Sequence, residues 1–363
     1  MPPSSSPAVG MSAVLPTPGT APANAFPLRS EGVWQAAWKR LRKDRLGMVS
    51  MAIVALFVLM IVLTATGLVA KGWQREVGVP SAPPTFLGPA AATESTAALA
   101  LTGPVADISA VDPLAPRYAE WAERAAKYKT VETPKAETLP FGGDRVGRDV
   151  LSKAMKGTQT SVFVGLMGAI VATLIGTVLG ALGGFFGGKV GDFLEWLYSV
   201  FTSIPDILLI LSFAVIFGRG IGSVAMILAL VGWTGLYRQV RAEFIKHSTR
   251  DYVRSAEAIG ASTTSRMFRH ILPNVSHVIL VRMSLLVVGF IKYEVILSYL
   301  GLGVGVEDVS WGTMLAEAQS ELILGNWWQL VAATVFMAVF VTAFSLMTDA
   351  LRDALDPKLR GLE

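Results

Sequence analysis

The sequence contains no cysteine and only three histidines among its 363 residues. The absence of cysteine excludes disulfide bonds, thiolate metal sites, iron–sulfur clusters and cysteine nucleophiles. His247, His270 and His277 are too few for a convincing histidine-based metal site, so no metal or cofactor is expected in this chain. Charge is also scarce, since 16% of the residues are charged against about 25% in soluble domains.

Apolar residues are abundant, at 52% of the chain, and several uncharged runs are about 20 residues long. Such runs predict membrane-spanning helices, and therefore an all-α membrane protein. Six runs qualify, which predicts six transmembrane helices near 47–70, 161–186, 193–217, 221–237, 275–299 and 328–348. The third run is interrupted by Ile204-Pro205-Asp206, which predicts a kink.

The segments between the spans differ in composition. Residues 1–28 carry no charged side chain and are rich in Pro, Ser and Ala, which predicts disorder. As a helix, residues 29–46 would have one apolar, aromatic face and one basic face, as expected of an interfacial helix. The segment 71–140 is polar, and the tail 349–363 is charged.

The distribution of charge predicts an orientation, because basic loops stay in the cytoplasm. Segments 38–46 and 238–274 are rich in Lys and Arg, whereas 300–327 carries four acids and no basic residue. We therefore expect both termini and 238–274 in the cytoplasm, and 71–140 outside. The net charge of +4 is explained by this pattern and does not require a nucleic-acid partner.

Four glycines, Gly176, Gly180, Gly184 and Gly188, recur every four residues in and just after the second span. Small residues on one helical face let a second helix approach closely. Because four glycines in register weaken a helix, a close helix contact explains them better than exposure to lipid does.

Motifs for chemistry are missing or lack their context. The run from Gly183 to Lys189 has the spacing of a phosphate-binding loop, but Val190 follows where Ser or Thr is needed and no strand precedes it. No catalytic Ser/His/Asp set or carboxylate pair stands out. The sequence gives no case for an enzyme.

The polar stretch 238–274 contains a short amphipathic helix from Tyr252 to Ile259, which Gly260 interrupts. A second polar helix is expected to run to His270 and to end by Pro273. A basic, glycine-hinged projection of this kind suits docking on a partner. The composition alone is equally compatible with an ordinary basic loop.

This segment resembles the "EAA" loop of ABC importer permeases. Ala256, Gly260, Leu272 and Pro273 match that pattern, whereas Arg254, Ser255 and His270 depart from it, with Glu257 nearby. Further runs resemble the C-type permease subunits of the dipeptide/oligopeptide/nickel family. They are 140–152 (PFGGDRVGRDVLS), 294–303 (EVILSYLGLG), 310–315 (SWGTML) and 351–357 (LRDALDP).

The resemblance implies a type I ABC importer permease fold, with a five-helix core over 141–348 and a cytoplasmic coupling helix over 252–264. It implies a multi-pass protein of a bacterial inner membrane, with 71–140 in the periplasm. The implied partners are a second permease subunit, two P-loop ATPase subunits that bind ATP and Mg, and a periplasmic or lipid-anchored substrate-binding protein. The residues implied in ATPase coupling are Tyr252, Arg254, Ala256, Glu257, Gly260, Ala261, Ser262, Leu272 and Pro273.

Ionisable residues inside spans are candidates for function. We take Pro205, Asp206, Lys292 and Glu294 as candidates for a translocation pathway. Arg282 lies near the inner end of its span, where its side chain can reach the interface.

The predicted function is a transmembrane permease subunit of an ATP-driven importer of dipeptides or oligopeptides. A permease for a nickel chelate or another small solute, and a secondary carrier driven by an ion gradient, are the alternatives. A carrier usually shows internal repeats and an acidic relay, and no repeat is evident here.

Overall fold

The computed structural model describes residues 33–89, 112–127 and 134–355. The helices are, in chain order, α1 (Val33–Lys43), α2 (Arg45–Ala65), α3 (Tyr118–Lys127), α4 (Val150–Phe186), α5 (Gly188–Thr202), α6 (Asp206–Phe217), α7 (Ile221–Ser248), α8 (Asp251–Ala258), α9 (Thr263–Ser265), α10 (Leu272–Tyr299), α11 (Trp311–Ile323) and α12 (Trp328–Leu355). A π-helical segment, Arg266–Ile271, joins α9 to α10. In the part described, β-structure is limited to isolated bridges.

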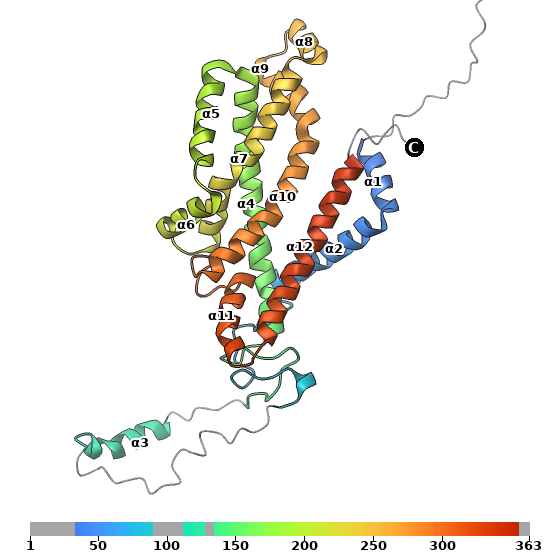
Figure 1. The fold of residues 1–363 in the computed structure, drawn as a ribbon. Coiled ribbons are helices and arrows are strands. Elements are labelled where there is room, and N and C mark those ends of the chain that lie inside the picture. The colour runs from blue at the N-terminus through green and yellow to red at the C-terminus, as the bar shows by residue number, and fades with distance from the viewer. Residues whose placement is uncertain (1–32, 90–111, 128–133, 356–363) are drawn as a thin grey trace, which may run out of the picture.

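Five helical stretches are long and apolar enough to cross a membrane, and α5 with α6 makes a sixth if that bent pair counts as one span. The prediction of an all-α membrane protein is therefore confirmed. Long helices stand side by side, with α8 at one end of the bundle and α11 at the other (Figure 1). We name these the α8 end and the α11 end. The ends of α1 and α12 meet on the side of the α8 end.

The predicted kink at Pro205 is a sharp break. Helix α5 ends at Thr202, α6 begins at Asp206, and the two axes differ by 85°. Proline has no N–H to donate, and it pushes the preceding residue out of the helical region. Pro205 accordingly takes the N-cap position of α6 with an extended ψ of 131°.

The predicted glycine face forms the contact between α4 and α7. A Cβ atom at Gly176, Gly180 or Gly184 would lie 2.5–2.8 Å from the carbonyl oxygens of Trp233, Tyr237 and Arg241. The backbones of α4 and α7 can therefore approach only because these positions lack side chains. Gly188 is different, because it follows the break after α4 and a Cβ there would meet nothing within 4 Å.

Two helix boundaries around 238–274 differ from the predicted ones. Helix α7 continues to Ser248, well beyond the expected end at 237, and the second polar helix does not end by Pro273. A continuous helical stretch runs instead from Thr263 to Tyr299. Pro273 is tolerated because it follows the π-helical segment and stands in the first turn of α10, where a missing N–H costs little.

At the α11 end, the polar segment 71–140 is partly described. Its residues near 76–84 form isolated bridges with residues 136–148, such as Glu76 with Arg148 and Pro84 with Leu139. The two flanks of this segment therefore pair with each other beside the start of α4. Helix α3 forms from the amphipathic stretch that the sequence shows near 113–130.

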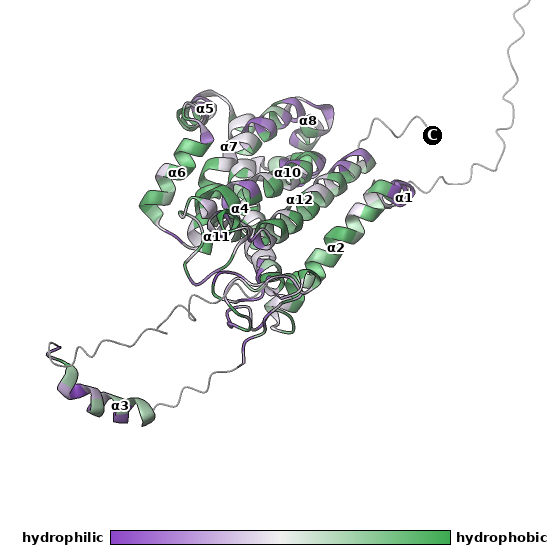
Figure 2. Ribbon diagram, turned by 60° about the horizontal axis from the view of Figure 1, so that its bottom comes forward, coloured by the Kyte–Doolittle hydropathy of each residue, from purple (hydrophilic) through white to green (hydrophobic). Residues whose placement is uncertain are grey.

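Helix α1 occupies the predicted interfacial region 29–46, and the Arg42 guanidinium lies 5.1 Å from the centre of the Trp38 ring. Figure 2 shows hydrophilic residues on α1 and α8 and mainly hydrophobic ones along α2 and α12. The disorder predicted for 1–28, and most of the tail 349–363, lie outside the described residues.

Candidate functional site

The turn after α8 is closed by a Schellman motif. The Gly260 N–H donates to the Glu257 carbonyl at 2.9 Å, and the Ala261 N–H donates to the Ala256 carbonyl at 2.9 Å. This motif requires a left-handed residue after the C-cap, and Gly260 has φ +89°. A Cβ at Gly260 would meet nothing within 4 Å, so glycine is needed there for its conformation and not for space.

One face of α8 packs on the bundle and the other is open. Val253 and Ala256 are buried, and Val253 belongs to a cluster with Met267 and Ile271 of the π-helical segment. Tyr252 and Arg254 are exposed on either side of this buried face. The Tyr252 hydroxyl lies 2.8 Å from Nδ1 of His247, at the end of α7.

The second arm of the turn is anchored by polar contacts. The Glu257 carboxylate pairs with the Arg266 guanidinium at 2.6 Å. Ser262 caps α9, because its hydroxyl accepts the Ser265 N–H at 3.3 Å. Leu272 and Pro273 lie farther on, at the start of α10. The fold thus brings together the predicted coupling residues from Tyr252 to Ser262 at the tip of the α8 end.

Ile259 is the most prominent side chain of this tip. It stands at the C-cap of α8 with 86% of its surface exposed. Single exposed aliphatic side chains are common on protein surfaces, so this exposure shows that Ile259 is free to contact a partner and does not by itself require one. The sequence reasoning did not single out Ile259, although its position beside Gly260 is a signal that could have found it.

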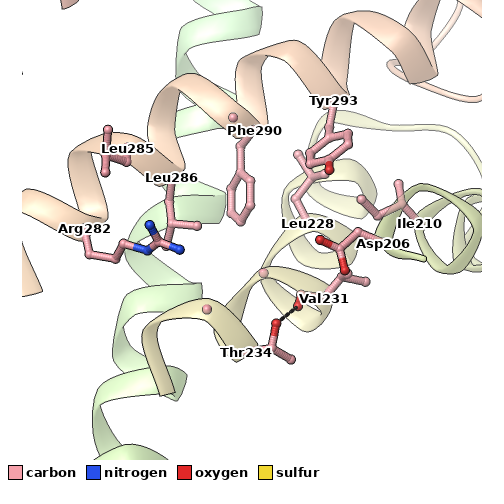
Figure 3. A pocket seen from close by; sticks show the side chains of 13 residues that line it. Asp206, Ile210, Leu228, Val231, Thr234, Arg282, Leu285, Leu286, Phe290 and Tyr293 are labelled. Carbon is pink, nitrogen blue, oxygen red and sulfur yellow. Dashed lines mark hydrogen bonds between the residues drawn. The ribbon is translucent and has the colours of Figure 1, made fainter. Parts of the chain in front are cut away.

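The candidates for a pathway are distributed over different environments. Asp206 lines a cavity of about 160 Å³ between α6, α7 and α10, together with Arg282 and Tyr293 (Figure 3). Pro205 precedes Asp206 at the break. Lys292 is exposed on α10, makes no ion pair with any described residue and does not line this cavity.

Glu294 lies in the packed interior. It is fully buried, and the Ser298 hydroxyl donates to its Oε1 at 2.6 Å. Beside it, a Cβ at Gly312 of α11 would lie 2.5 Å from the Val295 carbonyl, so α10 and α11 are in close contact there. Glu294 therefore lies at a junction of helices and away from the cavity that Asp206 lines.

A charged cluster at the α11 end was missed by the sequence reasoning. The side chain of Lys153, in the first turn of α4, is 1% exposed. Its ammonium donates to Asp144 at 2.8 Å, to Glu317 of α11, and to Gln329 of α12 at 3.5 Å. These partners are as many as 176 positions away in sequence, a distance that no local motif reveals.

In this cluster, burial raises the pKa values of the carboxyl groups, and neighbouring charges and hydrogen bonds lower them. Burial raises the pKa of Asp144, but the Lys153 charge and hydrogen bonds from Lys153, Arg148 and Val146 outweigh it, so the pKa lies below its usual range. Burial raises the pKa of Glu321 above its usual range, despite the Arg145 N–H that donates to its Oε1 at 2.9 Å. The other oxygen of Glu321 is buried without a hydrogen-bond partner.

Within 33–89, 112–127 and 134–355, no group of three or more His, Asp or Glu side chains could hold a metal ion. The structure thus has an exposed turn at one end, a cavity with two charged residues in its lining within the bundle, and a buried ionic cluster at the other end.

Comparison with known proteins decides the family. Residues 172–361 match the model of the binding-protein-dependent transport system inner membrane component. The chain belongs to this family. Residues 32–71 match a second model, the N-terminal transmembrane domain of oligopeptide transport permease C. The predicted resemblance to C-type permease subunits is therefore confirmed.

Individual relatives agree with this assignment. The chain is 38% identical over 220 residues to the oligopeptide transport permease OppC of Escherichia coli K12, which covers 61% of this chain and 72% of the relative. It is 32% identical to the dipeptide transport permease DppC of Bacillus subtilis, over 61% of this chain and 69% of the relative. A Lactococcus lactis DppC matches at 29% over 90% of both chains.

Among solved structures, the chain is similar to the inward-facing MetNI methionine ABC transporter, with a TM-score of 0.46 and 17% identity. That likeness covers 56% of this chain and 96% of the other chain. The family assignment rests on the sequence relatives and on the apolar helices.

Proposed function

We propose that this chain is the permease subunit of an ATP-driven importer of dipeptides or oligopeptides, with the α8 tip as its contact to the ATPases. The observation that carries the proposal is the exposed tip itself, on one end of a membrane bundle whose relatives are peptide-transport permeases. ATP and Mg are bound by the partner ATPases, and this chain catalyses no reaction. A second permease and a substrate-binding protein complete the assembly.

In this proposal the α8 end is cytoplasmic, both termini lie there, and the α11 end faces the periplasm across a bacterial inner membrane. The basic residues of α1 and of 238–274 support that orientation. The residues that act in coupling are those from Tyr252 to Ser262, with Leu272 and Pro273 at the root of the second arm. The buried face of α8 would carry motion of the tip into α7 and α10.

A permease must alternate between packings that open to opposite sides, and ATP binding must favour one of them. The break at Pro205 and the cavity beside it are where we place the pathway, with Asp206 on its wall and Lys292 and Glu294 as further candidates. The tightly packed contact between α4 and α7 is suited to move as one body.

The test of the coupling role is Gly260→Asp. Because a Cβ there has open space and Asp tolerates a left-handed φ, the chain should fold and insert into the membrane normally. A carboxylate at the tip should keep α8 from its seat on the ATPase, so substrate-stimulated ATP hydrolysis by the purified complex should be abolished. Normal stimulation would show that the tip has no coupling role.

Gly325→Asp is the matched control for assembly. Gly325 follows α11 with φ +86°, has nothing within 4 Å of an added Cβ, and lies at the opposite end. Both variants therefore carry the same strain and the same charge. The amount of folded chain in the membrane should be equal in the two variants, whereas only Gly260→Asp should lose substrate-stimulated ATP hydrolysis. The proposed import is tested separately, by ATP-dependent uptake of a labelled dipeptide into proteoliposomes with the binding protein present.

The secondary-carrier alternative makes the opposite prediction for purification, because a carrier needs no ATPase. A chain that purifies alone in several mild detergents, and that takes up peptide without ATP, would favour it. The family assignment supports the importer instead.

A further inference from the structure

The cavity between α6, α7 and α10 contains two opposite charges that have no partner in the described part of the chain. Arg282, which is half-buried, and Asp206, which is exposed at the start of α6, both line it, and neither makes an ion pair with a described residue. The Arg282 Nε atom is buried and lacks a hydrogen-bond partner. An ionisable side chain within the span region is a candidate for contact with a ligand, a water-filled path or a partner.

The walls between these charges are made of small and apolar residues. On α10, Arg282, Leu286, Gly289 and Tyr293 are spaced i, i+4, i+7 and i+11, so they share one face of the helix and line the cavity. An added Cβ at Gly289 would meet nothing within 4 Å, so this glycine keeps the space open.

The opposite wall holds Arg282 in place. A Cβ on Gly235 of α7 would lie 3.1 Å from the Arg282 Nη2 atom, so the guanidinium rests against this glycine. Any larger residue at Gly235 would push it away. The side chain therefore points across the helix contact into the cavity and does not extend along α10 toward an interface (Figure 3).

The two charges lie toward different parts of the cavity. Figure 3 shows Asp206 beside Tyr293, and Arg282 farther along α10 with Phe290 and Leu286 between them. Tyr293 is eleven residues after Arg282, which corresponds to about 16 Å along the helix axis. Arg282 is therefore nearer the α8 end, and Asp206 is nearer the α11 end.

We propose that this cavity is a binding subsite for a short zwitterionic peptide, with the carboxylate on Arg282 and the ammonium group near Asp206. A guanidinium matches a carboxylate by paired hydrogen bonds, and a carboxylate matches an ammonium. The cavity is small, at about 160 Å³, so it suits the ends of a short peptide and not a long folded chain. The inference rests on the proposed function, and it adds a direction: the carboxylate points toward the α8 end.

The absence of cysteine makes a direct test possible, because Leu286→Cys gives the chain a single thiol in the cavity wall. The assembled complex is treated with N-ethylmaleimide, and modification of this chain is followed by mass spectrometry. Alanylalanine should slow the modification, whereas alanylalanine amide, which lacks the carboxylate, should protect far less. Leu285→Cys, on the same cavity, provides a second thiol if the first variant does not assemble.

Arg282→Gln in the same background should raise the alanylalanine concentration for half-protection about tenfold or more, the worth of one charge-assisted pair. Arg282→Lys should restore part of the protection. A thiol at Val215, which is 71% exposed on α6 and outside the cavity lining, should show no protection by either peptide.

Equal protection by both peptides, or none by either, would overturn the subsite. In the second case the two charges would serve contact with the second permease. If the wild-type complex shows no ATP-driven dipeptide uptake, the proposed function is refuted. A failure of the subsite can therefore be told apart from a failure of the proposed function.

Discussion

At the α8 end, the turn itself is closed by contacts between residues that are close in sequence, and only the apolar cluster beneath it reaches back to Ala181 of α4, whereas at the α11 end Lys153 joins residues up to 176 positions apart. The tip depends on two backbone hydrogen bonds, one ion pair and a small apolar cluster, and its large side chain Ile259 is exposed. The α11 end depends on buried charges that connect α4, α11 and α12.

This difference separates two kinds of sensitivity. Buried ion pairs are strongly destabilising when one partner is removed, because the other charge stays buried. Exposed turns held by local contacts open and close at little cost. We therefore expect substitutions at the α11 end to change stability, and those at the tip to change coupling and leave stability nearly intact.

The largest expected effect is that of Lys153→Met. The change leaves the buried Asp144 with only its longer ion pair to Arg148, at 3.9 Å, and removes the cation from Glu317, so the expected loss is about 3–5 kcal/mol. Thermal unfolding in detergent, followed by tryptophan fluorescence, measures it. Lys135→Met breaks an exposed pair with Glu76 and should cost about 1 kcal/mol or less. Similar melting curves for both variants would remove the contrast between the two ends.

The contact between α4 and α7 lies between the two ends, and Gly180→Ala tests it. The new methyl group would meet the Tyr237 carbonyl at 2.8 Å, so the helices must separate. The expected loss of stability is about 1–3 kcal/mol. Gly222→Ala in α7 has nothing within 4 Å and should stabilise that helix by up to about 1 kcal/mol. A gain in both variants would mean that α4 and α7 do not touch along the glycines.

A smaller effect is expected for Glu321→Gln. Because burial raises the pKa of Glu321, its stability contribution is present below the unfolded value and is lost as the pH rises through the folded value. The amide keeps an oxygen for the Arg145 N–H and avoids the buried charge. The variant should therefore be more stable than the parent by about 1 kcal/mol at neutral pH. If the melting temperatures of the variant and the parent differ by the same amount at acidic and at neutral pH, ionisation of Glu321 is not the cause.

Ile259→Ala should have the smallest effect on stability. Its side chain is 86% exposed and contributes little to folding, so the change should stay within about 0.5 kcal/mol. Substrate-stimulated ATP hydrolysis should nevertheless fall, because the side chain would be lost from the docking surface. Measuring both stability and stimulated ATP hydrolysis separates the two ends of the molecule. Ile259→Ala should lower the stimulation more than the stability, and Lys153→Met should lower the stability more than the stimulation.

Much of the helical plan could be predicted from the sequence, because its signals are local. The glycine spacing predicted a close contact of α4 with another helix, which is α7, and Pro205 predicted a kink, which is a break between α5 and α6. Gly260 marked the turn after α8, since glycine favours the left-handed conformation that a Schellman motif requires. Each of these depends on residues within a few turns of one helix.

The remaining features depend on distant residues or on irregular helix geometry. Lys153 stands at the start of a span among residues that looked ordinary, and its partners come from other helices. Pro273 was expected to end a helix, but the preceding π-helical segment accommodates it. The Arg282 side chain was expected to reach the membrane interface, whereas its guanidinium packs against Gly235 of α7.

The central claim is that the α8 end, and not the α11 end, contacts the ATPases. Ile259→Cys and Val306→Cys place single thiols at the two ends, with wild-type exposures of 86% and 88%. Each purified variant is labelled with a photoactivatable maleimide before the ATPases are added, and the assembled complex is then illuminated. The account predicts a cross-link from position 259 to a P-loop ATPase and none from position 306. A cross-link to the ATPase from position 306, with none from position 259, would contradict it.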